Sequence, residues 1–514
     1  MTALPTLTER AAGVLLHPTS LPGAYGNGDL GAEAYRFVDF LAAAGQRWWQ
    51  MLPVHPVGEG YSPYTGLSAF AGAPHLIALE PLVREGWLTP AEAAPPSRDH
   101  PGRAHYARAL RFRESRLRRA FARYEAGARA AERRRWAAFC AAEADWLEDY
   151  ALFAAIKQAQ GGARWMEWPE PVRVRRPAAL RAARRELAEE IRFRTFLQYQ
   201  FHRQWQALRA HCRARGVALL GDVPIFVAHD SADAWAHPDL FHMDRHGRLP
   251  IMAGVPPDAF SANGQRWGNP LYKWPRHRAT GYAWWSARLR ATLRRFDAVR
   301  LDHFIGFVRY WAIPGGQRTA RHGRFRPGPG AHFLKHLQAE FGRLPLIAED
   351  LGIVTQAVTA LRELFDLPGM RVLQFAFGGN DPANPHLPHN HDRNGVVYTG
   401  THDNDTAVGW AHARRGRPLR AEVQRALDYL GQPGGPDTPV HWALIRLAYL
   451  SVANLAMVPV QDLLGLGNEA RMNRPGVARG NWDWRLAPDA LTDELAERLA
   501  ALVRLYGRID DRTT

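Results

Sequence analysis

Charged side chains stand at the ends of several apolar runs of this chain. Asp302 ends one run, with Arg300 two residues earlier, and Glu349 ends the next run. A later run ends at His402 and Asp403. Retaining cleavage of a glycosidic bond needs a carboxylate nucleophile and a carboxylic acid about 5–5.5 Å apart. On neighbouring strands, Asp302 and Glu349 would supply that pair, Arg300 would keep Asp302 ionised, and Asp403 would face both from across the pocket.

Each of these residues also has a structural interpretation. A single Asp at a strand end is commonly a helix cap or a turn residue, and we expect Asp350 and Asp405 to be structural residues of that kind. The structural alternative for Glu349 is one half of a buried ion pair. For His303 or His402 it is a buried histidine that orients a neighbouring side chain. Because independent caps rarely coincide at three strand ends, the joint pattern favours catalysis.

The apolar runs indicate the elements that must position these residues. Each run is short and most are followed by a helical pattern, which is typical of repeated strand and helix units. The eight runs begin at Gly13, Arg47, Gly216, Phe296, Leu344, Arg371, Gly395 and Ala453. They predict an α/β fold, a (β/α)8 TIM barrel, whose active site lies at the C-terminal ends of the strands. Asp222 of the third run would join the other carboxylates there.

Two insertions divide the predicted barrel. Residues 1–80 hold strands one and two and a loop at the mouth, and residues 81–210, rich in Ala, Arg, Glu and Leu, predict an inserted helical subdomain. The remaining residues, 211–514, complete the catalytic barrel. Within them, about 228–282 is rich in Gly, Pro, His and Trp with little periodicity, too long for an ordinary connection, and is therefore predicted to be a substrate-binding loop insertion.

Aromatic side chains are the second indication of a sugar site, because the flat faces of sugar rings pack on indole and phenol rings. From composition alone, contact with ligand and burial stay equally open for Trp267, Tyr272 and Trp274 of the long loop and for Tyr61 and Tyr64 after the second run. Trp48, Trp49 and Trp311 lie within apolar runs and are predicted core residues.

The formal net charge of +16 raises nucleic-acid binding as an alternative from another class. Only Lys157, Lys273 and Lys335 are lysines, and the arginines spread through a helical region also rich in Ala and Glu. This distribution favours solvated helix faces and no nucleic-acid partner.

The cysteines and the N-terminus indicate the compartment. Cys140 and Cys212 have no metal-ligand spacing, which argues against a disulfide framework or zinc site and favours the cytoplasm. The N-terminal residues lack an apolar signal core and no apolar run approaches the ~18 residues of a membrane span, so no membrane partner is expected.

A series of longer motifs resembles glycoside hydrolase family 77, the amylomaltases and disproportionating enzymes. In chain order the motifs are LLHPTSLPGAYGNGDLG, SPYTGLSAFAGAP, GDVPIFVAHDSADAW, AGVPPDAFSANGQRWGNPLYKW, VRLDHFIGF, IAEDLG, YTGTHDNDT and ARMNRPGVARGNWDWR. They span nearly the whole chain, and their fixed order is far more specific than any single motif. The resemblance implies a barrel without the C-terminal β-domain of α-amylase relatives.

The resemblance also implies an activity and individual roles. It implies transfer of a segment of an α-1,4-glucan to the 4-hydroxyl of another glucan or glucose by retaining double displacement. This chemistry requires no cofactor, and the sequence has no convincing calcium loop, so no metal is expected. Asp302 resembles the nucleophile, Glu349 the acid/base and Asp403 the transition-state stabiliser. Arg300 would hold Asp302, and His402 would bond sugar hydroxyls. By the same similarity, the glucan subsites are lined by Tyr64, Asp222, Asp258, Trp267 and Asn473.

Some positions depart from the family pattern. Ile305 stands where relatives often carry Arg, Thr65 where Gln is usual, and Ala73 where Asn is common. His55 alters a turn near the mouth, which leaves the acceptor preference open. The expected partners are α-1,4-glucans and maltooligosaccharides, and the chain is expected to be a monomer or weak homo-oligomer. A hydrolytic or debranching α-glucosidase with the same carboxylates remains the nearest alternative.

Overall fold

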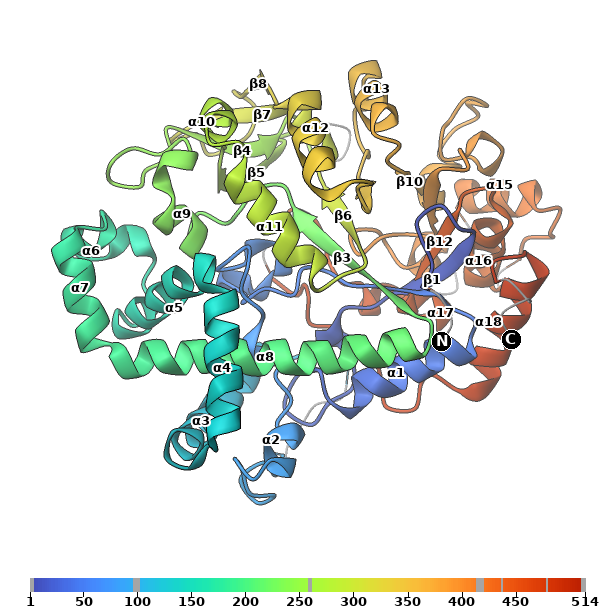
Figure 1. The fold of residues 1–514 in the computed structure, drawn as a ribbon. Helices are drawn as coiled ribbons and strands as arrows, with labels where there is room; N and C mark the ends of the chain where they lie inside the picture. The colour runs from blue at the N-terminus through green and yellow to red at the C-terminus, as the bar shows by residue number, and fades with distance from the viewer. Residues whose placement is uncertain are drawn as a thin grey trace.

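Eight parallel strands close into a barrel at the centre of the molecule (Figure 1). The computed structural model describes residues 4–95, 102–257, 261–412, 420–435, 438–477 and 479–509. The barrel strands are β1 (Ala11–Leu15), β2 (Trp48–Gln50), β3 (Ala218–Pro224), β6 (Ala298–Asp302), β9 (Leu346–Ala348), β10 (Gly369–Val372), β11 (Gly395–Tyr398) and β12 (Leu455–Pro459). Each lies beside the barrel strand before it in the chain, and β12 closes on β1. The predicted (β/α)8 barrel is confirmed.

The barrel strands are buried because helices cover the outside and side chains fill the inside. Every residue of β1 and β12 is buried, and Trp48 and Trp49 of β2 are core residues as predicted. Gly13 of β1 faces β2, where a Cβ would come within 2.6 Å of the Cβ of Trp48. Glycine at this position therefore allows the two strands to pair around a large indole.

Amphipathic helices cover the barrel. They are α1 (Ala32–Ala43), α8 (Ala188–Ala214), α11 (Ala283–Leu293), α12 (Gly330–Phe341), α13 (Gln356–Leu364), α15 (Ala421–Tyr429), α16 (Val440–Leu450) and α18 (Asp493–Leu505). In α18 the buried residues Ala496, Leu499 and Val503 recur at helical spacing, which gives one apolar face toward the barrel. The described residues after Pro459 form helices and no strand.

The region 81–210 is helical where it is described. Its helices are α2 (Glu80–Arg84), α3 (Tyr106–Gly127), α4 (Ala130–Ala142), α5 (Ala144–Ala159), α6 (Glu170–Arg173), α7 (Pro177–Glu186) and most of α8, and α4 to α7 gather on one side of the barrel (Figure 1). Lys157 of α5 pairs with Asp230 at 2.6 Å, which joins this region to the loop after β3. Because α8 continues past residue 210 to Ala214 and packs on the barrel, the domain boundary at 210 stays a prediction.

Many arginines of the helical region are paired with acids. Arg118 lies 2.8 Å from both Glu114 and Glu190, and Arg192 lies 2.7 Å from Glu125. These contacts agree with the interpretation of the arginines as solvated helix faces. In the described part of the chain, no helix is both long enough and apolar enough to cross a bilayer.

A second, four-stranded antiparallel sheet lies partly within residues 228–282, the predicted loop insertion. It consists of β4 (Ile251–Val255), β5 (Gln265–Pro270), β7 (Arg309–Pro314) and β8 (Arg324–Pro327), in the order β5-β4-β7-β8. The same loop also holds the short helices α9 (Ala232–Ala236) and α10 (Trp274–Ala279). The sheet joins the loop after β3 to the loop after β6. Trp311, predicted to lie in the core, is instead half-buried in this sheet, against a small cluster separate from the main core.

Candidate active site

The ends of β6 and β9 bring Asp302 and Glu349 side by side. Leu301 of β6 is paired with Ala348 of β9, so Asp302 and Glu349 are the next residues on two adjacent strands. Backbones of adjacent strands lie about 4.8 Å apart. This spacing suits the separation of about 5–5.5 Å between the two carboxyl groups of a retaining site.

Arg300 joins Asp302 to a buried network. Its Nη2 lies 2.9 Å from Asp302 Oδ1, and its Nη1 donates to Asp222 Oδ1 at 3.0 Å and Oδ2 at 2.8 Å. The hydroxyl of Tyr64 also donates to Asp222 Oδ2, at 2.7 Å. Burial lowers the pKa of Arg300, but Asp222 and Asp302 outweigh it and raise that pKa well above its usual value. A permanently charged guanidinium therefore holds both carboxylates.

Glu349 has a different environment. It is only 8% exposed, and its carboxyl accepts hydrogen bonds from the backbone N–H of His303 at 2.7 Å and of Leu351 at 3.1 Å. Burial raises the pKa of Glu349 to about 8; Asp302 acts in the same direction, while Arg300 and the two N–H donors oppose it. His303 adopts a left-handed φ of 56°, uncommon for a residue with a side chain. At neutral pH the Glu349 carboxyl is mostly protonated, the state that a general acid needs.

Asp403 and His402 lie on the loop that follows β11. Asp403 Oδ1 accepts a hydrogen bond from Asn473 Nδ2 at 2.6 Å and lies 3.4 Å from His402 Nε2. The Asp403 side chain remains 45% exposed, so it can reach a ligand. The His402 ring stacks on Tyr64, with centroids 5.2 Å apart. Through Tyr64 this group meets the Asp222 and Arg300 network, so the predicted residues converge.

Burial separates the aromatic candidates of the long loop. Trp267 is 38% exposed and its ring stands at right angles to the His303 ring, with centroids 4.9 Å apart, which places it beside the carboxylate pair. Tyr272 is fully buried and donates to the backbone oxygen of Ile225 at 2.8 Å, and Trp274 is also buried. Trp267 therefore fits ligand contact, whereas Tyr272 and Trp274 belong to the core. The predicted subsite residue Asp258 lies outside the described residues.

Two site residues were not singled out from the sequence, although both belong to its last motif. The Trp482 ring lies 5.8 Å from the Tyr64 ring and 6.0 Å from the His402 ring. Arg471 donates to Asp405 and to the backbone oxygen of Asp403. Both residues hold the loop that carries the predicted stabiliser, and their position in a specific motif was the available signal.

The residues expected to be structural make structural contacts. Asp350 accepts a hydrogen bond from the backbone N–H of Met370 at 2.7 Å, which ties β9 to β10. Asp405 pairs with Arg471, as described above. Neither contact involves Asp302 or Glu349.

A barrel that carries an arginine-paired aspartate beside a buried glutamate at its strand ends has the arrangement of enzymes that cleave glycosidic bonds with retention. The sequence profile of glycoside hydrolase family 77, described as 4-alpha-glucanotransferase, matches residues 16–492. The chain therefore belongs to glycoside hydrolase family 77.

Individual relatives agree over the whole length. The chain is 48% identical to a 4-alpha-glucanotransferase of Synechocystis sp., over 98% of this chain and 99% of that protein. It is 49% identical to a 4-alpha-glucanotransferase of Thermus thermophilus, over 97% and 99%. Among solved structures, the amylomaltase of Streptococcus agalactiae in complex with acarbose has a TM-score of 0.93 and 35% identity, over 98% of this chain and 100% of that one. The expected family and activity are confirmed: the chain is a 4-alpha-glucanotransferase that acts on α-1,4-glucans.

Proposed function

We propose that the enzyme transfers glucan segments to the 4-hydroxyl of a second glucan or glucose by double displacement at Asp302 and Glu349. In the first step Asp302 attacks the anomeric carbon, Glu349 protonates the glycosidic oxygen, and the reducing-end fragment leaves. The site supports this assignment because Arg300 pairs with Asp302 at 2.9 Å, while burial favours the protonated form of Glu349.

In the second step the Glu349 carboxylate takes the proton of an incoming 4-hydroxyl. The hydroxyl oxygen attacks the anomeric carbon, and the bond to Asp302 breaks. Two inversions at one carbon give overall retention. Asp403 would stabilise the positive charge that develops on the sugar ring in each step, and His402 would bond its hydroxyl groups.

This proposal rests on the different partners of the two adjacent carboxyl groups: Asp302 pairs with Arg300, whereas buried Glu349 accepts hydrogen bonds from two backbone N–H groups. Incubation with maltotriose tests it: we expect released glucose together with a ladder of longer maltooligosaccharides, read by chromatography. A hydrolytic α-glucosidase with the same carboxylates would only shorten the substrate, and that result would contradict the proposal.

Trp267 would favour transfer over hydrolysis by covering the site. Trp267→Ala should lower kcat/KM for transfer about tenfold and increase the share of donor lost to water, because a sugar acceptor loses its apolar contact. The two products are measured together, as longer oligosaccharides and as new reducing ends. The matched control is Phe325→Ala, at an exposed aromatic of β8 in the same sheet, which should leave the ratio unchanged. An unchanged ratio in Trp267→Ala would remove Trp267 from the acceptor side.

We infer that four further residues contact the bound glucan: Tyr64, Asp222, Asp258 and Asn473. Ligand titration of single variants tests this inference.

Other features of the chain support proposals about its compartment and partners. The free cysteines Cys140 and Cys212 suit a reducing cytoplasm, and the paired arginines of the helical region argue against a nucleic-acid partner. We also infer a monomer or weak homo-oligomer, which sedimentation measures.

A further inference from the structure

One buried carboxylate binds both ends of the loop that carries His402 and Asp403. Asp462, which is 1% exposed, lies on α17 (Val460–Leu463) directly after β12. Its Oδ2 accepts a hydrogen bond from the hydroxyl of Thr399 at 2.6 Å, and its Oδ1 accepts one from the backbone N–H of Ala407 at 2.7 Å. Thr399 follows the last residue of β11, and Ala407 is the first residue of α14 (Ala407–Ala411). The two oxygens therefore hold the loop 399–407 where it leaves the barrel and where it ends.

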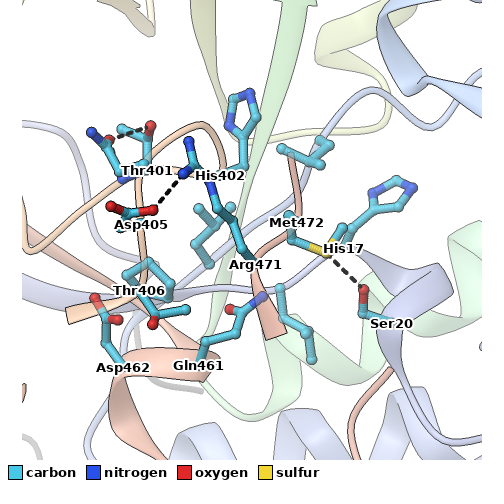
Figure 2. Close-up of a pocket in the computed structure, with 15 residues that line it drawn as sticks. His17, Ser20, Thr401, His402, Asp405, Thr406, Gln461, Asp462, Arg471 and Met472 are labelled. Atoms are coloured by element: carbon cyan, nitrogen blue, oxygen red, sulfur yellow. Dashed lines mark hydrogen bonds and ion pairs between the residues drawn. The ribbon is translucent and has the colours of Figure 1, made fainter. Parts of the chain in front are cut away.

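One side of the loop lines a small pocket. Thr401, Asp405, Thr406, Asp462 and Arg471 are among the residues that line it. Figure 2 shows Asp462 beside Thr406, with Arg471 reaching Asp405 across the same space. A wall bordered by open space has fewer packing contacts than a closed core. Polar contacts with Asp462 and Arg471 therefore contribute to the position of the loop on this side.

The other contacts of the loop hold its middle. Arg471 and Asn473 bind Asp405 and Asp403, and the backbone N–H of Thr406 donates to Asn468 Oδ1 at 3.1 Å. These partners come from the segment 468–473, and Gln374, just after β10, also donates to the backbone oxygen of Asp405 at 2.8 Å. Asp462 lies just after β12 and, unlike these partners, binds the loop at both of its ends. Hydrogen bonds to an ionised carboxylate are stronger than neutral ones, which suits this task.

We propose that Asp462 is a positioning residue of the transfer reaction, which fixes loop 399–407 so that Asp403 and His402 face the scissile bond. Asp462 touches no substrate and acts through Thr399 and Ala407. The inference rests on the proposed roles of Asp403 and His402. A displacement of a reacting group by about 1 Å can lower a rate about 100-fold, so a loosened loop should lower kcat while the ground-state contacts of the glucan largely persist.

Paired variants at both partners test this role. Asp462→Ala removes both contacts, and Thr399→Val removes one while keeping the side-chain shape. We expect each to lower kcat for maltotriose about 10- to 100-fold, with KM within about threefold. Asp462→Asn and Thr399→Ser should keep kcat within about threefold, since the amide oxygen still accepts from Ala407 and a hydroxyl can either donate or accept. If Asp462→Ala fails to fold, Thr399→Val and the two conservative variants still decide the question.

Asp297→Asn is the matched control. Asp297 precedes β6 at the opposite end of the barrel, where it accepts from the backbone N–H of Leu219 at 3.0 Å and pairs with Arg209 at 2.7 Å. Its loss should lower the melting temperature and leave kcat unchanged. Equal kcat losses in Asp297→Asn and Thr399→Val would overturn the inference, as would full kcat in both Asp462→Ala and Thr399→Val. Asp403→Asn separates the two claims: if it keeps full activity, the proposed role of Asp403 fails, and if it alone is inactive, only the role of Asp462 fails.

Discussion

Asp302→Ala should remove transfer activity and leave the fold intact. We expect kcat for maltotriose to fall by about 10⁴- to 10⁶-fold, because the covalent sugar intermediate can no longer form. The barrel should tolerate the change, since Asp302 is a partly exposed residue at a strand end and Arg300 keeps its two hydrogen bonds to Asp222. Product analysis and a thermal melt of the same preparation measure the two effects.

Asp350→Asn provides the control for this variant. Asp350 is also a carboxylate at the end of a barrel strand, but it binds the backbone of Met370 and not the cleft. Its replacement should lower stability and leave kcat within about threefold. Activity of Asp302→Ala above about 1% of wild type would remove Asp302 as the nucleophile.

The barrel and its carboxylates could be predicted because their signals are local. A buried strand in a parallel barrel is a short apolar run, and a polar residue directly after it lies at the mouth. Asp302 and Glu349 follow this rule, and the chain order of the strands places them on neighbours. Arg300 and Asp222 meet because they are paired residues on the adjacent strands β6 and β3.

The second sheet had no comparable local signal. Strand β4 pairs with β7, which lies more than 50 residues further along the chain, and all four residues of β8 are exposed, so no apolar alternation marks it. No local pattern in the sequence indicated which aromatic side chains of the long loop are buried. Trp267 and Tyr272 share one Gly- and Pro-rich segment and both contact Phe226, and only the burial of Tyr272 separates a core residue from a candidate ligand contact. The contact between Thr399 and Asp462 likewise joins residues 63 positions apart.

Glu349→Gln should produce the second large effect, and that effect should depend on the leaving group. With maltotriose, kcat should fall about 10³-fold or more, since the glycosidic oxygen leaves without a proton. α-Maltosyl fluoride needs no such proton, because fluoride is a good leaving group. We therefore expect the variant to release fluoride in a burst and to accumulate a maltosyl ester on Asp302, which is detected as added mass on the protein. A variant equally slow with both donors would contradict the acid role.

The raised pKa of Glu349 also makes catalysis and stability depend on pH in the same direction. Burial and the negative Asp302 raise that pKa to about 8, against about 4.3 in an unfolded chain. Between these values the folded protein holds a proton that the unfolded chain has lost, so the contribution of Glu349 to stability is largest below about pH 4.3 and is lost as the pH rises toward 8. The wild-type kcat/KM should fall above about pH 8, as the acid deprotonates. The glutamine of Glu349→Gln stays neutral, so the melting temperature of this variant should exceed that of wild type by an amount that grows between about pH 5 and pH 8. The corresponding difference in the free energy of unfolding is on the order of a few kcal/mol. If the difference in melting temperature between wild type and Glu349→Gln stays constant across this pH range, the pKa of the Glu349 carboxyl is not raised.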